Sequence, residues 1–245
     1  MIRLNDRRIL FGMLKAAGVP ETDYDRALIT LDKLDKIGVD GVTAELAEYA
    51  PEAAAAIGAD LAKLDPAGQP LEVAAMLEVL PTDIDREPVT ELAALAATVA
   101  DGIPAGVTLV FDPTLVRGMG YYTGTIFEIA HPSSGSSVGG GGRYDGMIGR
   151  FLAQSVPAVG SSIGFERIID LVELDETRTQ RAVALLWDDA TDTAELLRTK
   201  RELIADGARV QLAKRRKNMK QLFSYLKTEG FTHVMNVGET PRELN

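Results

Sequence analysis

Hydrophobic residues over the first hundred positions recur at the spacing of helices, after one short strand-like segment. Met1–Leu4 predicts the strand, and Asp6–Ala17 predicts a helix that Gly18 and Pro20 bring to an end. The helical spacing continues over four further segments: Asp23–Ile37, which ends at Gly38, then Thr43–Ile57, Leu71–Leu80 and Val89–Val99. We therefore expect residues 21–101 to form a helical insertion, whose alanines favour helix formation and close helix packing.

The hydrophobic pattern then changes to that of strands. Val107–Asp112 and Thr125–Ala130 predict two strands, and His131–Ser137 has the composition of a turn. This part is completed by a glycine-rich strand Ser137–Arg143, a helix Tyr144–Phe151, a strand Ala158–Ser162 and a helix Ile163–Val172. Hairpin-connected strands of this kind predict an α+β fold, an antiparallel sheet with helices packed on one side.

The last 65 residues alternate between strand and helix patterns. The predicted order is strand Ala182–Trp187, helix Thr193–Ala205, strand Arg209–Leu212, helix Met219–Thr228 and strand His233–Val237. Such alternation predicts parallel strands in a separate α/β domain, with the charged segment Glu173–Gln180 as the linker. We thus expect a core made of residues 1–20 and 102–174, the insertion 21–101, and a domain 181–245 that ends soon after its third strand.

Composition narrows the possible function classes. The chain has 245 residues, 46% of them hydrophobic and 25% charged, which is typical of a globular protein. No apolar run approaches the ~18 residues needed to span a membrane, and the N-terminus lacks the apolar stretch of a signal peptide. With no cysteine and two separated histidines, we expect no metal site built from these residues. The composition therefore predicts a cytoplasmic protein without a membrane partner.

Basic residues are concentrated near the C-terminus, although the net charge is −10. Residues 181–245 carry 12 Lys/Arg against 9 Asp/Glu, whereas the first 180 carry 14 against 27. The cluster consists of Lys214, Arg215, Arg216, Lys217 and Lys220. It is equally consistent with a phosphate-contacting patch for a nucleic acid and with the solvated face of a surface helix.

Four consecutive glycines, Gly139–Gly142, lie inside a strand-like segment. Glycine weakens a strand and leaves no side chain on it, so this run is typical either of a loop or bulge or of a ligand that lies on the backbone. Arg143 and Tyr144 follow directly and place a cation and a phenol at its end. They favour the second interpretation, a binding site for a small polar ligand.

Two arginines flank this run. Arg117 follows a predicted strand, where a guanidinium can bind a carboxylate or phosphoryl oxygen through two parallel hydrogen bonds. Arg167 lies in the first turn of a predicted helix that follows Gly164, and helix N-termini favour anions. Taken alone, Arg117 is more typical of a surface ion pair, and the glycine spacing before Arg167 is also typical of tight helix–sheet packing with an exposed arginine. If Tyr121 and Tyr122 begin a strand, they point to opposite faces of it.

As an ordered set these segments resemble the histidyl-tRNA synthetases, which are class II aminoacyl-tRNA synthetases. The segment Arg117–Gly124 resembles that family's histidine-specific signature, Gly139–Asp145 its glycine-rich strand in the histidine pocket, and Gly160–Arg167 motif 3. The resemblance extends upstream to Arg3–Arg7 and Leu31–Gly38, which resemble the segment after motif 2, and downstream to Arg181–Val237, which resembles the α/β anticodon-binding domain.

The resemblance implies a role for each candidate residue. Arg117 would contact the α-phosphate of ATP and the carboxylate of histidine. Tyr122 and Tyr144 would recognise the imidazole, and Tyr121 would line the same pocket. The floor of that pocket would be formed by Gly140, Gly141 and Gly142. Gly164 and Arg167 would bind ATP, and Arg167 would hold its terminal phosphates.

The implied reaction is the ligation of histidine to tRNA(His) with ATP as a substrate. The carboxylate of histidine would attack the α-phosphate of ATP to give histidyl-adenylate and pyrophosphate, and acyl transfer to the 3′ end of the tRNA would follow. Mg²⁺ would assist the phosphoryl chemistry. The family also implies a homodimer, and the basic cluster 214–217 with Lys220 would contact the tRNA.

Two departures from the family pattern bear on these expectations. Gly120 occupies the position of the usual aspartate, so the hydrogen bonds of that carboxylate are absent. Motifs 1 and 2 have no counterpart in these 245 residues, so we expect the chain to be a fragment that is inactive alone. The alternative is a non-catalytic paralogue that senses histidine, a regulatory protein with no need of Arg167 or of a basic C-terminal domain. An unrelated α+β protein with a small-molecule pocket is the third possibility.

Overall fold

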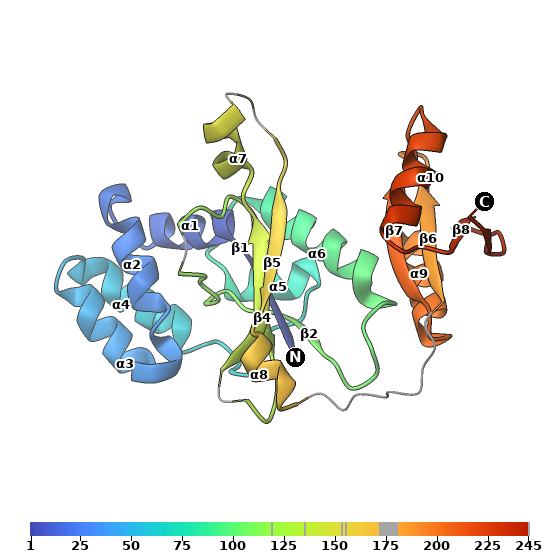
Figure 1. The fold of residues 1–245 in the computed structure, drawn as a ribbon. Helices are drawn as coiled ribbons and strands as arrows, with labels where there is room; N and C mark the ends of the chain where they lie inside the picture. The colour runs from blue at the N-terminus through green and yellow to red at the C-terminus, as the bar shows by residue number, and fades with distance from the viewer. Residues whose placement is uncertain (119, 135, 153, 155, 172–180, 245) are drawn as a thin grey trace. The chain divides into compact units, whose positions relative to one another are not determined.

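The computed structural model describes residues 1–118, 120–134, 136–152, 154, 156–171 and 181–244. The chain divides into two compact units (Figure 1). One contains Met1–Ala96 and Ala105–Val172, and the other contains Ala97–Pro104 and Glu173–Asn245. The predicted linker Glu173–Gln180 lies outside the described residues. Among the described residues, no helix combines the length and the apolar character that crossing a membrane requires.

The first unit is built on a five-stranded sheet of order β2-β1-β3-β4-β5. Its strands are β1 (Ile2–Asp6), β2 (Leu109–Phe111), β3 (Thr125–Ala130), β4 (Ser137–Arg143) and β5 (Val159–Ile163). The pairs β1/β3, β3/β4 and β4/β5 are antiparallel, and β1/β2 is parallel. The predicted α+β class with an antiparallel sheet is confirmed, except that β2, which forms within the predicted strand Val107–Asp112, pairs with β1 in parallel.

Helix α1 (Arg7–Ala16) follows β1 directly because Asp6 caps it. The Asp6 carboxylate accepts a hydrogen bond from the backbone N–H of Arg8 at 2.9 Å, as an N-cap aspartate does. Leu10 and Leu14 of this helix are buried in one apolar cluster, and Ile9 is buried in another. Helix α1 therefore contributes to both apolar clusters of this unit.

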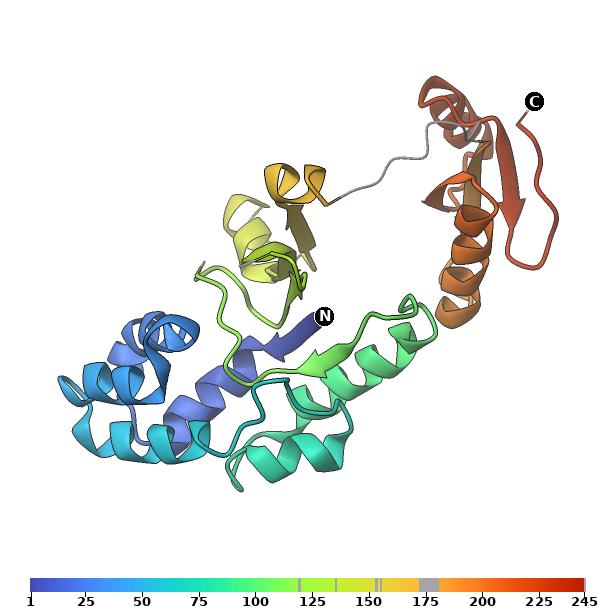
Figure 2. The same ribbon diagram turned by 90° about the horizontal axis from the view of Figure 1, so that it is seen from below.

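The helices after α1 divide between these two clusters. Helices α2 (Tyr24–Leu31), α3 (Leu34–Ala47) and α4 (Pro51–Leu61) form one group, seen together in Figure 1, whose buried side chains pack with Leu10, Leu115 and Ile126. Helices α5 (Val73–Val79) and α6 (Arg86–Ala100) pack with Leu4 and Phe111, and Figure 2 shows α6 running beside β2. Leu4 and Ile126 lie on opposite faces of the sheet by strand alternation, so both faces are covered. The expectation of helices on a single face was wrong.

Two predicted helices of the insertion are each interrupted. The segment Asp23–Ile37 is broken between α2 and α3, and α3 continues past the predicted stop at Gly38 through a kink. Gly38 has φ 68° and ψ 178°, a conformation that glycine alone adopts readily. The segment Thr43–Ile57 is divided because Pro51 occupies the first position of α4, where its missing N–H costs nothing.

The end of this unit is less helical than the sequence predicts. Ile163 belongs to β5, and helix α8 (Phe165–Ile169) has only five residues. Ile169 is 58% exposed, so the predicted apolar face of this helix is not buried. Helix α7 (Asp145–Leu152) forms where the sequence predicts a short helix. Val172, the predicted end of the last helix, lies outside the described residues.

The second unit is a four-stranded sheet of order β7-β6-β8-β9. Its elements are β6 (Ala182–Trp187), α9 (Thr193–Ala205), β7 (Arg209–Lys214), α10 (Met219–Thr228), β8 (His233–Asn236) and β9 (Arg242–Glu243). Strand β6 is parallel to β7 and β8 and is buried on both faces. Ala184 faces the cluster that contains α10, and Leu185 faces the cluster that contains α9. The predicted α/β domain with parallel strands is confirmed, and the antiparallel strand β9 is an addition.

Candidate functional site

One row of residues crosses the first sheet and supports the candidate site. Arg3 of β1 lies opposite Glu128 of β3, Glu128 lies opposite Gly140 of β4, and Gly140 lies opposite Ser162 of β5. Residues directly opposite one another share a face of the sheet. The charged pair and the bare glycine backbone are therefore neighbours on that face.

Arg117 lies over this row. Its guanidinium Nη1 donates a hydrogen bond to Glu128 Oε2 at 3.0 Å. An ideal Cβ on Gly140 would come within 2.8 Å of the same Nη1, so the guanidinium lies against the bare backbone. The side chain of Arg117 is 16% exposed, so a partly buried cation retains access to solvent. The structure thus joins Arg117 and the glycine run, two of the predicted site features.

Side chains at Gly141 and Gly142 would meet other neighbours than a side chain at Gly140. A Cβ on Gly142 would approach the Tyr122 ring to 2.9 Å and the carbonyl oxygen of Thr125 to 2.6 Å. Gly141 points to the other face, where a Cβ would meet the carbonyl oxygen of Gly160. The predicted bare floor is therefore covered in part by Arg117 and Tyr122 themselves. Strand pairing on both sides also leaves little room for side chains.

Three tyrosines form one aromatic cluster at the end of β4. The rings of Tyr121 and Tyr122 are 4.6 Å apart, and that of Tyr144 lies 5.7 Å from the first and 6.4 Å from the second. Tyr121 and Tyr122 lie in a turn and an irregular segment before β3, so the idea that they point to opposite faces of a strand was wrong. The neighbouring hydroxyl of Tyr122, together with burial, raises the pKa of Tyr121. Tyr122 is the most buried of the three.

Arg167 lies at the other end of β4. Its Nη1 donates a hydrogen bond of 2.6 Å to the carbonyl oxygen of Ser137, and the backbone N–H of Gly164 donates to Val138. Ser137 precedes Gly140 by three strand positions, or about 10 Å. Arg117 and Arg167 are therefore held at two points along the same strand. The predicted helix at this point, α8, has only five residues.

The basic cluster of the second unit is not the face of a helix. Lys214 ends β7, where its ammonium pairs with Asp189 at 2.5 Å and lies 5.2 Å from the centre of the Trp187 ring. Arg215, Arg216 and Lys217 are exposed in the loop that follows, and Lys220 is exposed in α10. The helix-face alternative therefore fails for residues 214–217. The cluster extends from the end of β7 through an exposed loop into the first turn of α10.

Three residues of the site were missed by sequence reasoning: Arg3, Glu128 and Asp112. Arg3 Nε donates to Asp112 Oδ2 at 2.6 Å, and Arg3 Nη1 lies 3.5 Å from Glu128 Oε1. Burial lowers the pKa of Arg3, but the charges of Asp112, Asp35 and Glu128 outweigh it and raise that pKa above its ordinary value. The sequence offered one signal for two of them, because Arg3 and Glu128 are charged residues that lie between apolar neighbours in predicted strands. Glu128 is flanked by Phe127 and Ile129.

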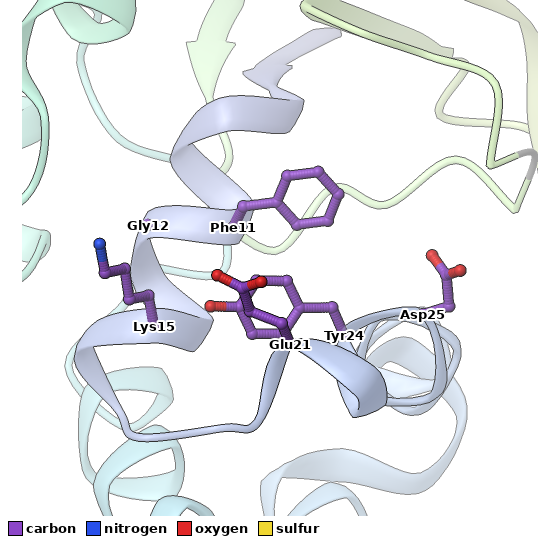
Figure 3. Close-up of a pocket in the computed structure, with 6 residues that line it drawn as sticks. All are labelled: Phe11, Gly12, Lys15, Glu21, Tyr24 and Asp25. Atoms are coloured by element: carbon purple, nitrogen blue, oxygen red, sulfur yellow. The ribbon is translucent and has the colours of Figure 1, made fainter.

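Two cavities are lined by residues of α2. One of about 230 Å³ is lined by Arg117 and the loop after it, together with Arg7 and Asp25. The other, an open groove of about 500 Å³ between α1 and α2, is drawn in Figure 3. Phe11 stacks on Tyr24 there with ring centres 5.5 Å apart, and Lys15 and Glu21 also line the groove.

The described residues contain no group of three or more His, Asp or Glu side chains able to hold a metal ion. The Mg²⁺ implied by the resemblance therefore has no assigned ligand here. Mg²⁺ at nucleotide sites is commonly held by one or two carboxylates and by the phosphates of the substrate. Glu128 and Asp112 are both engaged by arginines, so neither is free to serve as such a ligand without breaking an ion pair.

Comparisons with known proteins match most of the chain. A sequence model of the histidyl-tRNA synthetase family matches residues 1–168. A histidine–tRNA ligase of Leifsonia xyli subsp. xyli is 53% identical over 234 residues, which cover 94% of this chain and 54% of that protein. The chain therefore spans about half the length of this curated relative.

Solved structures agree with this match. A histidyl-tRNA synthetase from Nostoc sp. PCC 7120 is 26% identical, with a TM-score of 0.58 over 96% of this chain and 57% of its own. A Bacillus halodurans protein described as an ATP phosphoribosyltransferase regulatory subunit/histidyl-tRNA synthetase is 18% identical with a TM-score of 0.56, which shows a shared fold alone. On the family match and the identity to the Leifsonia protein, the chain belongs to the histidyl-tRNA synthetase family.

Proposed function

We propose that the protein containing this chain is a histidine–tRNA ligase, which activates histidine with ATP and transfers it to tRNA(His). The observation that carries the proposal is the placement of Arg117 over Gly140, on the sheet face that the tyrosine cluster adjoins. A cation beside phenol groups suits a ligand that has both a carboxylate and a polar ring. The 53% identity to a protein named histidine–tRNA ligase supports the same function.

Each residue has a role in this proposal. Arg117 binds the carboxylate of histidine and the α-phosphate, where it neutralises the charge that develops during attack on phosphorus. Tyr122 and Tyr144 recognise the imidazole, Tyr121 lines the pocket, and the backbone of Gly140, Gly141 and Gly142 forms its floor. Gly164 and Arg167 bind ATP, with Arg167 on the terminal phosphates. The work of the site is positioning and charge stabilisation.

The C-terminal unit is proposed to bind tRNA. Lys214, Arg215, Arg216, Lys217 and Lys220 would contact phosphates of the backbone, a role supported by the exposure of all five residues. A homodimer in the cytoplasm is the arrangement we propose for the whole protein. Mg²⁺ would neutralise phosphate charge when bound, and no residue of this chain is assigned to it.

The alternative, a histidine-sensing regulatory paralogue, has weaker support. The similar structure whose description includes such a subunit is 18% identical, which bears on fold alone. The relative at 53% identity is named as a ligase. A basic loop in the second unit also has no function in a protein that only senses histidine.

A chimera tests the proposal. The matched part of this chain, 94% of its length, would replace its counterpart in the Leifsonia enzyme, which supplies the remaining segments. We expect histidine-dependent exchange of pyrophosphate into ATP by the chimera. Calorimetry on the 245-residue chain alone should show weak binding of histidine and much less of phenylalanine, because polar partners in a site reject an analogue that lacks them. Equal responses to both amino acids would contradict the pocket assignment.

A further inference from the structure

We propose that Glu128 and Arg3 are positioning residues that fix the guanidinium of Arg117 over Gly140, and that Asp112 anchors this chain of charges. The inference rests on the proposed function, because it concerns how Arg117 meets the carboxylate of histidine. The sequence pattern predicted no role for Glu128, Arg3 or Asp112, although Arg3 lies in a segment that resembles the family. They are assigned from the geometry of the sheet.

The geometry is an alternating series of four charges. Asp112 Oδ2 accepts from Arg3 Nε at 2.6 Å, and Arg3 Nη1 lies 3.5 Å from Glu128 Oε1. The other carboxylate oxygen of Glu128, Oε2, accepts from Arg117 Nη1 at 3.0 Å. Each oxygen of Glu128 therefore faces a different guanidinium, so the carboxylate orientation fixes where Arg117 can lie.

The anchor of the series is rigid. Asp112 also accepts hydrogen bonds through Oδ1 from the backbone N–H of Thr114 at 2.9 Å and from its hydroxyl at 2.6 Å. The side chain of Asp112 is 9% exposed, that of Arg3 20% and that of Glu128 19%. Partly buried ion pairs are screened less by water than exposed ones. Arg3 lies on β1 and Asp112 directly follows β2, so this series of ion pairs holds Arg117 at a fixed position relative to these two strands.

Arg117 keeps donors for a ligand. A guanidinium has five N–H donors in a planar fork, and among the described residues the contact to Glu128 uses only Nη1. Nε and Nη2 of Arg117 have no hydrogen-bond partner among the described residues, so their N–H groups remain for a ligand. A ligand carboxylate would meet a guanidinium whose orientation is already fixed. This lowers the entropic cost of ordering the Arg117 side chain when the ligand binds.

The test compares histidine with histamine, which lacks the carboxylate, by calorimetry on the 245-residue chain. The unmodified chain should prefer histidine by about tenfold or more, the scale of one hydrogen bond to a charged group. Arg117→Ala should remove this preference. Glu128→Gln should reduce it to within about twofold while histamine affinity stays unchanged, because the carboxylate contact alone depends on the orientation of Arg117.

Two further variants complete the design. Glu128→Asp keeps the charge and should restore part of the preference, whereas Glu52→Gln, an exposed glutamate of α4, should change neither affinity. An unaltered preference in Glu128→Gln, or an equal loss for both ligands, would overturn the positioning role. If the unmodified chain binds histidine no better than phenylalanine, the proposed function itself fails, and this inference fails with it.

Discussion

The guanidinium of Arg117 lies where a side chain on Gly140 would begin. An ideal Cβ at Gly140 would come within 2.8 Å of Arg117 Nη1 and 3.0 Å of its Cζ. The same Cβ would lie 2.6 Å from the carbonyl oxygen of Phe127, which is backbone and cannot rotate away. Glycine at position 140 is therefore required both by the strand pairing and by the arginine.

Gly140→Ala should destabilise the chain and displace Arg117. Overpacking of this kind costs about 1–3 kcal/mol. A lower midpoint in urea denaturation, together with loss of the preference for histidine over histamine, is the expected result. Gly120→Ala is the matched control, because a Cβ there meets nothing within 4 Å. Similar midpoints for both variants would show that the space at Gly140 is not restricted.

Arg117→Ala should impair adenylate formation in the chimera with the Leifsonia enzyme. Loss of one preorganised charge stabiliser lowers kcat by ~10²–10³-fold. ATP–pyrophosphate exchange measures the effect directly. Circular dichroism of the variant serves as the control for folding. An unchanged exchange rate would remove Arg117 from the mechanism.

Replacing the basic cluster with glutamines should weaken tRNA binding by the chimera. Each lost phosphate contact lowers the slope of log affinity against log salt by ~0.7–0.9. Lys214 is expected to contribute least, because Asp189 already pairs with it at 2.5 Å. Histidine activation should not change, since the site for it lies in the other unit. A salt slope equal to that of the unmodified protein would mean that the cluster is only a solvated loop.

Asp145 should stabilise the segment that leads from β4 to β5 in a pH-dependent way. The backbone N–H of Ala158 donates to Asp145 Oδ1 at 2.8 Å, and Arg143 Nε donates to Oδ2 at 2.8 Å. The hydrogen bond from Ala158, followed by that from Arg143, lowers the pKa of Asp145. A carboxylate with a depressed pKa contributes stability above its unfolded pKa of about 3.9, and the contribution is lost as the pH falls through the lower folded value.

The measurement is the difference in Tm between the unmodified chain and Asp145→Ala. We expect this difference to be full at pH 7 and to shrink as the pH falls below about 4. The exposed Asp83 provides a control variant, Asp83→Ala, whose Tm difference should be small throughout. A difference for Asp145→Ala that is the same at pH 3 and pH 7 would show that its ionised form contributes nothing.

Local pattern alone determined most of the secondary structure. The strands Thr125–Ala130, Ser137–Arg143 and Ala182–Trp187 and the helices Thr193–Ala205 and Met219–Thr228 form at their predicted limits. Such elements depend on hydrophobic period, capping and turn residues, all of which lie within a few positions of one another. The same locality explains the errors in the insertion, where the predicted helix Thr43–Ile57 ran across Pro51 and the predicted stop at Gly38 is only a kink within α3.

The sequence predicted candidate site residues where they form part of an unusual segment, as in Gly139–Gly142 and Arg117–Gly124. Their partners were not found. Arg3 and Asp112 are 109 positions apart. Nothing in the sequence near an isolated arginine or aspartate indicates which residue it will pair with. Only the register of β1 with β3 and of β3 with β4 brings Arg3, Glu128 and Gly140 into one row. Strand register is set by long-range burial and pairing, so the tertiary structure alone decided how Arg117 is held.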